Sequence, residues 1–117
     1  MSQFPIGKNS FIGICLPLET IRQCDEILRH SKNIKSFAKF LTALLCLHAQ
    51  RHNADSKVIL TPIFESYLDG YLVIIQPTDW NEVLLLRGVV DLYGIDYLPA
   101  LIVYLVAEYY QLEVSSR

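Results

Sequence analysis

The sequence predicts an α+β fold that is mostly helical and is built from two tandem strand–helix–helix units. A chain of 117 residues, 52% hydrophobic and 19% charged, has the composition of a folded globular protein. A β-prone run that ends in proline precedes two helical segments in the first half of the chain. The same order of elements recurs in the second half, which suggests two similar units.

The first expected element is a short strand from Ser10 to Leu16. Alternate side chains of a strand point to opposite faces, so one set should face the core. The core-facing set is Ile12, Ile14 and Leu16. The outward-facing set is Phe11, Gly13 and Cys15. Pro17 ends the strand, because proline has no N–H for a ladder and suits the entry to a helix.

Two helices are expected next, over residues 18–30 and 34–52. The first has apolar side chains at helical spacing. Residues 31–33 break this pattern, and Asn33 is a suitable N-cap for the second helix. The second helix is apolar almost all round beyond its first turn, which is typical of a helix buried between partners.

A turn-rich linker, residues 51–56, leads to two β-prone runs within residues 57–77. Asp69 and Gly70 lie between the runs and form a good hairpin signal. Pro62 within the first run is typical of an edge strand. The residues of the second run expected to face outward are Tyr71, Val73 and Ile75.

The third expected helix covers residues 78–94. Asp79 and Glu82 stand at capping-box spacing at its start, and Gly94 is a suitable stop at its end. The two signals together predict both ends of this helix.

The last expected helix covers residues 95–114. Asp96 is expected to be its N-cap. Pro99 then falls in the first turn, where proline is tolerated.

The two units are residues 1–53 and residues 54–117. Pro17 and Pro77, which end the two expected strands, are 60 positions apart, and the expected second helices begin 61 positions apart. An internal duplication explains these spacings, and chance recurrence of helix pairs explains them equally. One strand and two helices cannot bury their own apolar faces, so we expect the units to intertwine and the protein to be oligomeric.

Charge is unevenly distributed, although the net charge is only −2. Residues 1–58 hold eight Lys and Arg against four Asp and Glu, whereas residues 59–117 hold two against eight. The basic half favours a polyanion such as DNA, and the acidic half favours a protein partner; alternatively, opposite halves attract each other within an oligomer. A chain this short and this hydrophobic should leave an apolar patch exposed on its surface. Because such patches usually mark oligomer interfaces, we expect a homodimer or higher oligomer.

The sequence lacks the signatures of enzymes, cofactor sites and membrane proteins. No P-loop, dinucleotide, nucleophile-elbow or zinc-protease motif occurs, so we expect neither catalysis nor a cofactor. His48 and His52 stand at i, i+4, but two ligands make an incomplete metal site, and histidines also suit a helix end.

No signal peptide is visible, and the apolar run Tyr97–Ala107 is too short to span a bilayer. We expect a cytoplasmic protein with reduced thiols, of which Cys46 lies in the core.

Residues 10–50 resemble the ribbon-helix-helix family of DNA-binding proteins. The resemblance rests on the alternating strand that ends in Leu16-Pro17, on ETIRQCDEIL in the place of the family's first helix, and on the break before the second helix. It implies that the strands of two units pair into an antiparallel ribbon, which enters the major groove of DNA. It also implies that the start of the second helix binds phosphate. With a second unit in residues 54–117, one chain supplies both halves of such a fold.

The resemblance assigns candidate DNA-contacting residues to two places. The expected phosphate-binding residues, around the start of the second helix, are Lys32, Asn33, Lys35, Ser36 and Lys39. The expected base or backbone contacts, on and before the first strand, are Lys8, Asn9, Ser10, Phe11, Gly13 and Cys15. The sequence therefore predicts a small DNA-binding transcription regulator of ribbon-helix-helix type.

The alternative is a non-enzymatic protein-interaction or assembly module that keeps this fold without reading DNA. The outward-facing strand residues carry almost no hydrogen-bonding groups, which base edges require. An apolar strand face exposed to water is unfavourable. We therefore expect another layer, either residues 58–64 or a second subunit, to cover it.

Overall fold

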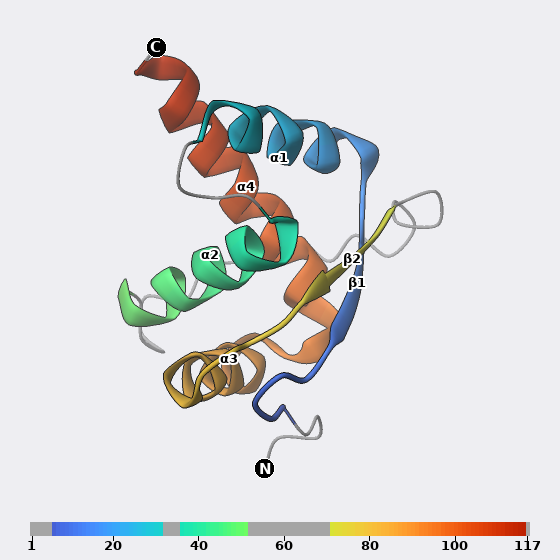
Figure 1. Cartoon of the computed structure of the whole chain (residues 1–117), viewed down its shortest axis with the longest axis vertical. Helices are drawn as coiled ribbons and strands as arrows, with labels where there is room; N and C mark the ends of the chain where they lie inside the picture. Colours follow the sequence, from blue (N-terminus) through green and yellow to red (C-terminus); the bar gives the residue numbers. More distant parts are fainter. Residues whose placement is uncertain (1–5, 32–35, 52–70, 117) are drawn as a thin grey trace.

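In the residues that the structure describes, two strands from distant parts of the chain pair into an antiparallel ribbon, and four α-helices pack together on one side of it (Figure 1). The computed structural model describes residues 6–31, 36–51 and 71–116. In chain order, the elements are β1 (Ile12–Leu16), α1 (Leu18–His30), α2 (Phe37–Arg51), β2 (Tyr71–Ile75), α3 (Trp80–Tyr93), the 3₁₀ turn η2 (Ile95–Tyr97) and α4 (Leu98–Ser115). The predicted class, α+β and mostly helical, is confirmed.

The ribbon joins the two halves of the chain within one molecule. Ile12 pairs with Ile75 at one end of it, and Leu16 pairs with Tyr71 at the other. The predicted orientation of β1 is confirmed: Ile12, Ile14 and Leu16 are buried.

The orientation predicted for β2 is wrong. Ile75 is fully buried and Val73 is half-buried, whereas Leu72 and Ile74 are exposed. Pairing with β1 causes the difference, because Ile74 lies opposite the outward-facing Gly13. The two strands are therefore not equivalent at the 60-residue offset inferred from Pro17 and Pro77.

The helices contact each other mainly across the two halves of the chain. α1 packs against α4, and α3 packs against α2. α2 and α4 also cross each other; α2 contacts β2, and α4 contacts β1. Their shared core contains the fully or almost fully buried Phe40, Leu41, Leu45, Leu101 and Ile102. The core therefore depends on both halves.

α1 forms as predicted, from Leu18 to His30, and it begins directly after Pro17. α2 begins at Phe37, and the preceding Ser36 is its cap, since the Ser36 hydroxyl accepts a hydrogen bond from the Lys39 N–H at 3.3 Å. The predicted cap, Asn33, lies outside the described residues.

The ends of α3 are as predicted. The Asp79 carboxylate accepts a hydrogen bond from the Glu82 N–H at 2.8 Å. The Glu82 carboxylate accepts in turn from the Thr78 N–H at 2.8 Å, one residue before the cap. Gly94 ends the helix with φ of 90°, and its N–H donates to the Val90 carbonyl.

The start predicted for the last helix is wrong in one respect. Asp96 lies within the 3₁₀ turn η2 and does not cap α4. Tyr97 occupies the cap position, without a side-chain hydrogen bond, and Pro99 lies in the first turn as predicted. Because the 3₁₀ turn follows Gly94 directly, α4 begins only at Leu98.

Several predicted features lie outside the described residues. They are the hairpin at Asp69-Gly70, the edge strand at Pro62, most of the linker 51–56 and the covering segment 58–64. In the part of the chain that the structure describes, no single helix is long and apolar enough to cross a membrane. Taken together, α3 and the segment Ile95–Ser115 reach that length and composition, but they are bent by 94°.

Two glycines give opposite predictions for substitution by alanine. Gly94 has φ of +90°, a conformation that alanine rarely adopts, so Gly94→Ala should lower the free energy of unfolding by about 1–3 kcal/mol. Gly88 lies exposed within α3, and an added methyl group meets nothing within 4 Å. Gly88→Ala should therefore raise the free energy of unfolding by about 0.5–1 kcal/mol. Urea titration of both variants checks the signs, and a stabilising Gly94→Ala would contradict this account of the turn.

Candidate functional site

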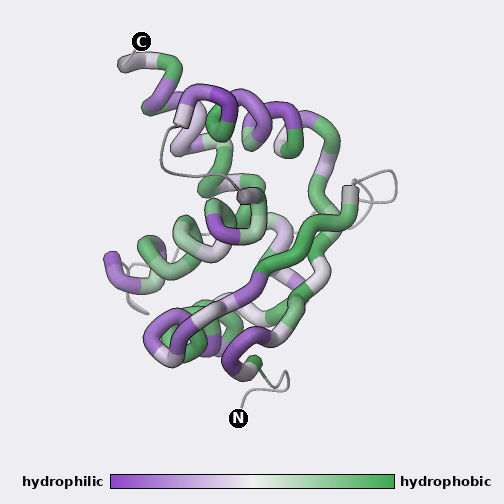
Figure 2. Tube along the Cα trace, viewed as in Figure 1, coloured by the Kyte–Doolittle hydropathy of each residue, from purple (hydrophilic) through white to green (hydrophobic). Residues whose placement is uncertain are grey.

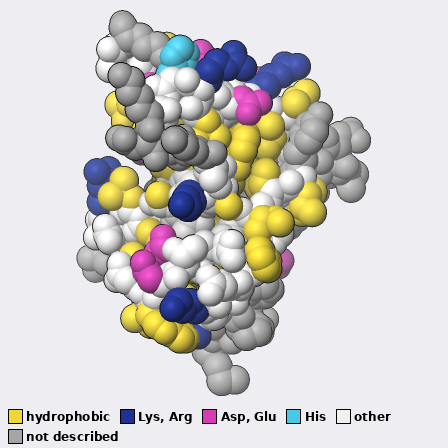
Figure 3. Space-filling model, in the orientation of Figure 1, with side chains coloured by type: hydrophobic (Ala, Val, Ile, Leu, Met, Phe, Trp, Pro, Cys, Tyr) yellow, Lys and Arg dark blue, Asp and Glu magenta, His cyan; other side chains and the backbone are white. Residues whose placement is uncertain are grey.

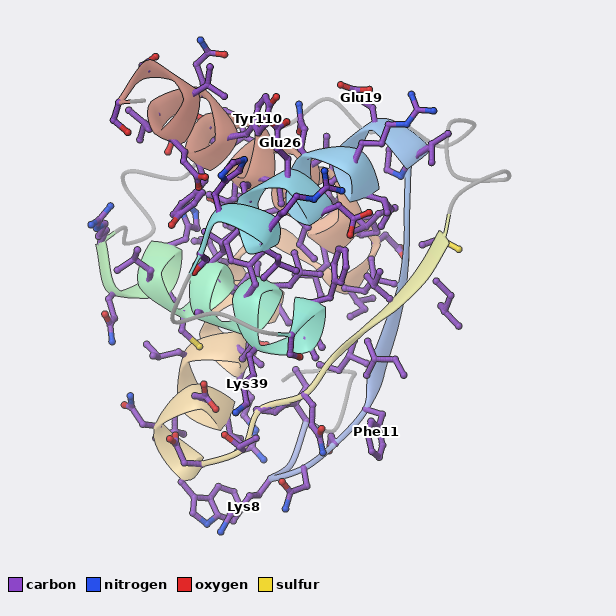
Figure 4. All side chains as sticks on the ribbon, turned by 45° about the horizontal axis from the view of Figure 1, so that its top comes forward. Lys8, Phe11, Glu19, Glu26, Lys39 and Tyr110 are labelled. Carbon is purple, nitrogen blue, oxygen red and sulfur yellow. The ribbon has the colours of Figure 1, made fainter. Side chains whose placement is uncertain are left out.

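The outward-facing side of the ribbon is an exposed apolar surface, which we call the ribbon face. It consists of Phe11, Gly13, Cys15, Leu72 and Ile74. Phe11 and Leu72 are each 69% exposed and Ile74 is 44% exposed. Figure 2 shows that β2 is strongly hydrophobic along most of its length, and in Figure 4 the Phe11 ring lies at the outer edge of the molecule. Such exposure in large apolar side chains favours an interaction surface.

The chemistry of the ribbon face does not suit base recognition. Base edges are read by hydrogen-bond donors and acceptors, and the Cys15 thiol is a weak donor. Leu72 leans towards Gly13, since a Cβ added at Gly13 would lie 3.3 Å from the Leu72 Cδ1. The side chain of Leu72 therefore occupies the space that glycine leaves, and the ribbon face stays apolar there.

The segment before β1 forms a tight turn at one end of the ribbon. Asn9 has φ of 64°, and its N–H donates to the Pro77 carbonyl at 2.8 Å. The Ser10 hydroxyl accepts from the Gly7 N–H at 2.8 Å. Thus the Asn9 amide N–H and the Ser10 hydroxyl already hold the turn, whereas Lys8 is exposed at its tip (Figure 4).

The predicted phosphate-binding residues are only partly described. The structure brings Ser36 and Lys39 together at the start of α2, with Lys39 exposed. Lys32, Asn33 and Lys35 lie outside the described residues. A helix start with a nearby cation suits an anion, but here the Ser36 hydroxyl already accepts from the Lys39 N–H.

The start of α4 is a poor counterpart to the start of α2. Asp96 is exposed just before it, and Pro99 in its first turn has no N–H to offer. A phosphate would meet a negative charge there and one donor fewer. If the two helix starts flanked one DNA site, only the α2 side would attract it.

A shallow apolar groove, which was not among the features predicted from the sequence, lies beside the ribbon. Figure 3 shows hydrophobic surface in the hollow between α1, the start of α2 and β2. The residues that line this groove are Ile21, Ser36, Phe37, Ala38, Leu72, Val73 and Ile74. They come from three separate elements, so no local sequence pattern could have revealed the groove. It extends the apolar surface around the β2 side of the ribbon.

His48 is buried and has a structural partner. Its Nε2 lies 2.8 Å from the Tyr93 hydroxyl, which links α2 to α3. His52 lies outside the described residues. Among residues 6–31, 36–51 and 71–116, no group of three or more His, Cys, Asp or Glu side chains is placed to hold a metal ion. The hydrogen bond to Tyr93 indicates a role for His48 in holding the helices together.

The three cysteines differ in burial, which predicts their reactivity. Burial, with a smaller effect of Asp25, raises the pKa of the Cys24 thiol to about 12. Burial, with smaller effects of Glu82 and Asp79, raises the pKa of the Cys46 thiol to about 11.

Cys15 is half-buried on the ribbon face. At pH 8, a maleimide should modify Cys15 first, because the thiolate is the reactive form. Peptide mass mapping checks this order, and earlier labelling of either buried thiol would contradict it.

The same burial predicts how stability depends on pH. In both buried thiols the folded-state pKa lies above the ordinary value of 9.0. The folded state therefore favours the protonated form, and this contribution to stability is complete below about pH 9 and is lost as the pH rises towards 11–12. The free energy of unfolding should be smaller at pH 10 than at pH 8. A Cys24→Ala/Cys46→Ala control should show a shallower decline.

Comparison with protein-family models, with curated proteins and with solved structures found no match for this chain.

Proposed function

We propose that the protein is a non-enzymatic interaction module with a ribbon-helix-helix-like architecture, which binds another protein surface through its ribbon face. One observation carries this proposal: large apolar side chains, Phe11, Leu72 and Ile74, are exposed together on the ribbon. The free energy falls when another protein covers apolar surface and removes it from water, whereas base edges and phosphates are bound by polar and cationic side chains.

The architecture is supported by the way the two units are combined. β1 pairs with β2, α1 packs on α4 and α3 packs on α2, as expected when two strand–helix–helix units exchange partners. α2 and α4 begin 61 positions apart, at Phe37 and Leu98. At the same offset, three pairs of buried residues coincide: Phe40 with Leu101, Leu41 with Ile102, and Leu45 with Val106. Shared burial at one spacing favours a duplicated unit.

The proposal is tested by placing a photo-crosslinking amino acid at position 74 on the ribbon face. The matched control places it at Asp91, which is exposed on α3. Irradiation in cells should give protein adducts from position 74 and few from position 91. Nucleic-acid adducts from position 74, or equal protein adducts from both positions, would overturn the proposal.

A second candidate function is DNA binding, which the exposed Lys39 beside the Ser36 cap favours. Titration with random duplex DNA and with the upstream region of its own gene, at low and near-physiological salt, separates the two. A regulator should prefer its own region by about 10³-fold or more. Its affinity should fall steeply with salt, and replacing Lys32, Lys35 and Lys39 together should flatten that fall. Equal, weak binding to both duplexes supports the interaction module.

A further inference from the structure

The two ends of the ribbon carry exposed side chains of opposite charge. Lys8 lies in the turn before β1, at the end where Ile12 pairs with Ile75. Glu19 lies in the first turn of α1, directly beyond the end where Leu16 pairs with Tyr71. Both are exposed, and Figure 4 shows them at opposite ends of the molecule. The apolar ribbon face lies between these two charges.

A second copy of the chain offers a complementary surface. Two β-layers can pack face to face with their strands roughly aligned, about 10 Å apart. A two-fold axis that runs across the strands places each end of one ribbon against the opposite end of the other. Apolar side chains then meet apolar side chains, and Lys8 of each copy faces Glu19 of the other.

The other face-to-face arrangement is less favourable. With the two-fold axis along the strands, Lys8 would face the region of Asp79 instead. Asp79 already accepts the capping hydrogen bond from the Glu82 N–H. In the described part of the chain, the Glu19 carboxylate has no side-chain or backbone partner, so it is the better acceptor for an incoming lysine.

We propose that the ribbon face is covered by a second copy of this chain. The two ribbons stack with the Ile12–Ile75 end of each against the Leu16–Tyr71 end of the other, so that Lys8 and Glu19 pair at both ends. This inference rests on the proposed function and names its partner. The two-fold arrangement forms both charge pairs at once and closes the assembly at a dimer, because each chain has one ribbon face.

The dimer is tested by sedimentation of the full chain over a range of concentrations. Leu72→Lys puts one positive charge from each copy into the apolar centre of the dimer interface, and it should weaken the dimer by about 100-fold or more. Leu84→Lys is the matched control, since Leu84 is 63% exposed on α3, and it should leave dimerisation unchanged. Circular dichroism confirms that both variants fold. A wild-type chain that stays monomeric would overturn the second copy as partner, whereas adducts at position 74 would still support the interaction module.

The orientation is tested by reversing charges. Lys8→Glu and Glu19→Lys should each weaken the dimer by about tenfold, because both symmetric pairs are lost, and added salt should reduce this effect. The double variant should restore most of the affinity. Arg29→Glu, at the far end of α1, is the control and should change little. A dimer that Leu72→Lys disrupts but that shows no rescue in the double variant would overturn the reversed orientation alone.

Discussion

Replacing Phe40 by alanine should lower the free energy of unfolding by about 3–5 kcal/mol. The Phe40 side chain is 1% exposed in the middle of the core, where α2 crosses α4. Its ring meets the Tyr109 ring edge to face, with 5.3 Å between centroids. Alanine removes this contact and leaves a cavity that packed helices fill only in part. For a domain with a total stability of about 5–15 kcal/mol, the loss would bring the chain close to unfolding.

Urea titration followed by circular dichroism measures the effect of Phe40→Ala. Phe11→Ala is the matched control, because Phe11 is 69% exposed on the ribbon face. In the monomer it should change the free energy of unfolding by less than about 0.5 kcal/mol. If both phenylalanines cost the same, Phe40 does not hold the two halves of the chain together.

The helices could be predicted from local patterns. α1 has a polar outer side and a buried side that includes Cys24 and Ile27, and this periodicity predicts both ends of the helix. α3 was predicted from its ends, since the Asp79 cap and the Gly94 stop use chemistry that depends only on neighbouring residues. These signals require no knowledge of what packs on the helix.

The start of α4 had no comparable signal. The helix is apolar almost all round, and its cap residue, Tyr97, makes no side-chain capping bond. Asp96 has the residue type of an N-cap but lies one residue too early, inside the 3₁₀ turn after Gly94. A turn that connects two packed helices is set by their relative position, which a local pattern does not contain.

The candidate site was also predictable only in part. The alternation of β1 placed Phe11, Gly13 and Cys15 on the outward side correctly, because its inward set was uniformly apolar and its length was fixed by Pro17. Leu72 and Ile74, the other members of the ribbon face, were assigned to the wrong side. Their run is apolar at successive positions, so it has no period of two from which a face can be read.

Replacing Ile75 by aspartate tests the orientation of β2 and should cost about 3–5 kcal/mol at pH 7, because it buries a charge without a partner. Ile75 is fully buried and pairs with Ile12 at one end of the ribbon. Burial should raise the pKa of the new carboxyl group in the folded state. Because the protonated form is then favoured on folding, the loss should be smaller at pH 4 than at pH 7.

Ile74→Asp is the matched control, one residue away on the same strand and 44% exposed. It should leave the monomer folded, with a change in the free energy of unfolding within about 0.5 kcal/mol. Its effect should fall on association instead, since the new charge lies in the ribbon face. A folded Ile75→Asp and an unfolded Ile74→Asp would reverse β2 and place Leu72 and Ile74 on the inside. In that case the ribbon would present Val73 and Ile75 outward, and the ribbon face as we define it, with Leu72 and Ile74 against the second copy, would be wrong.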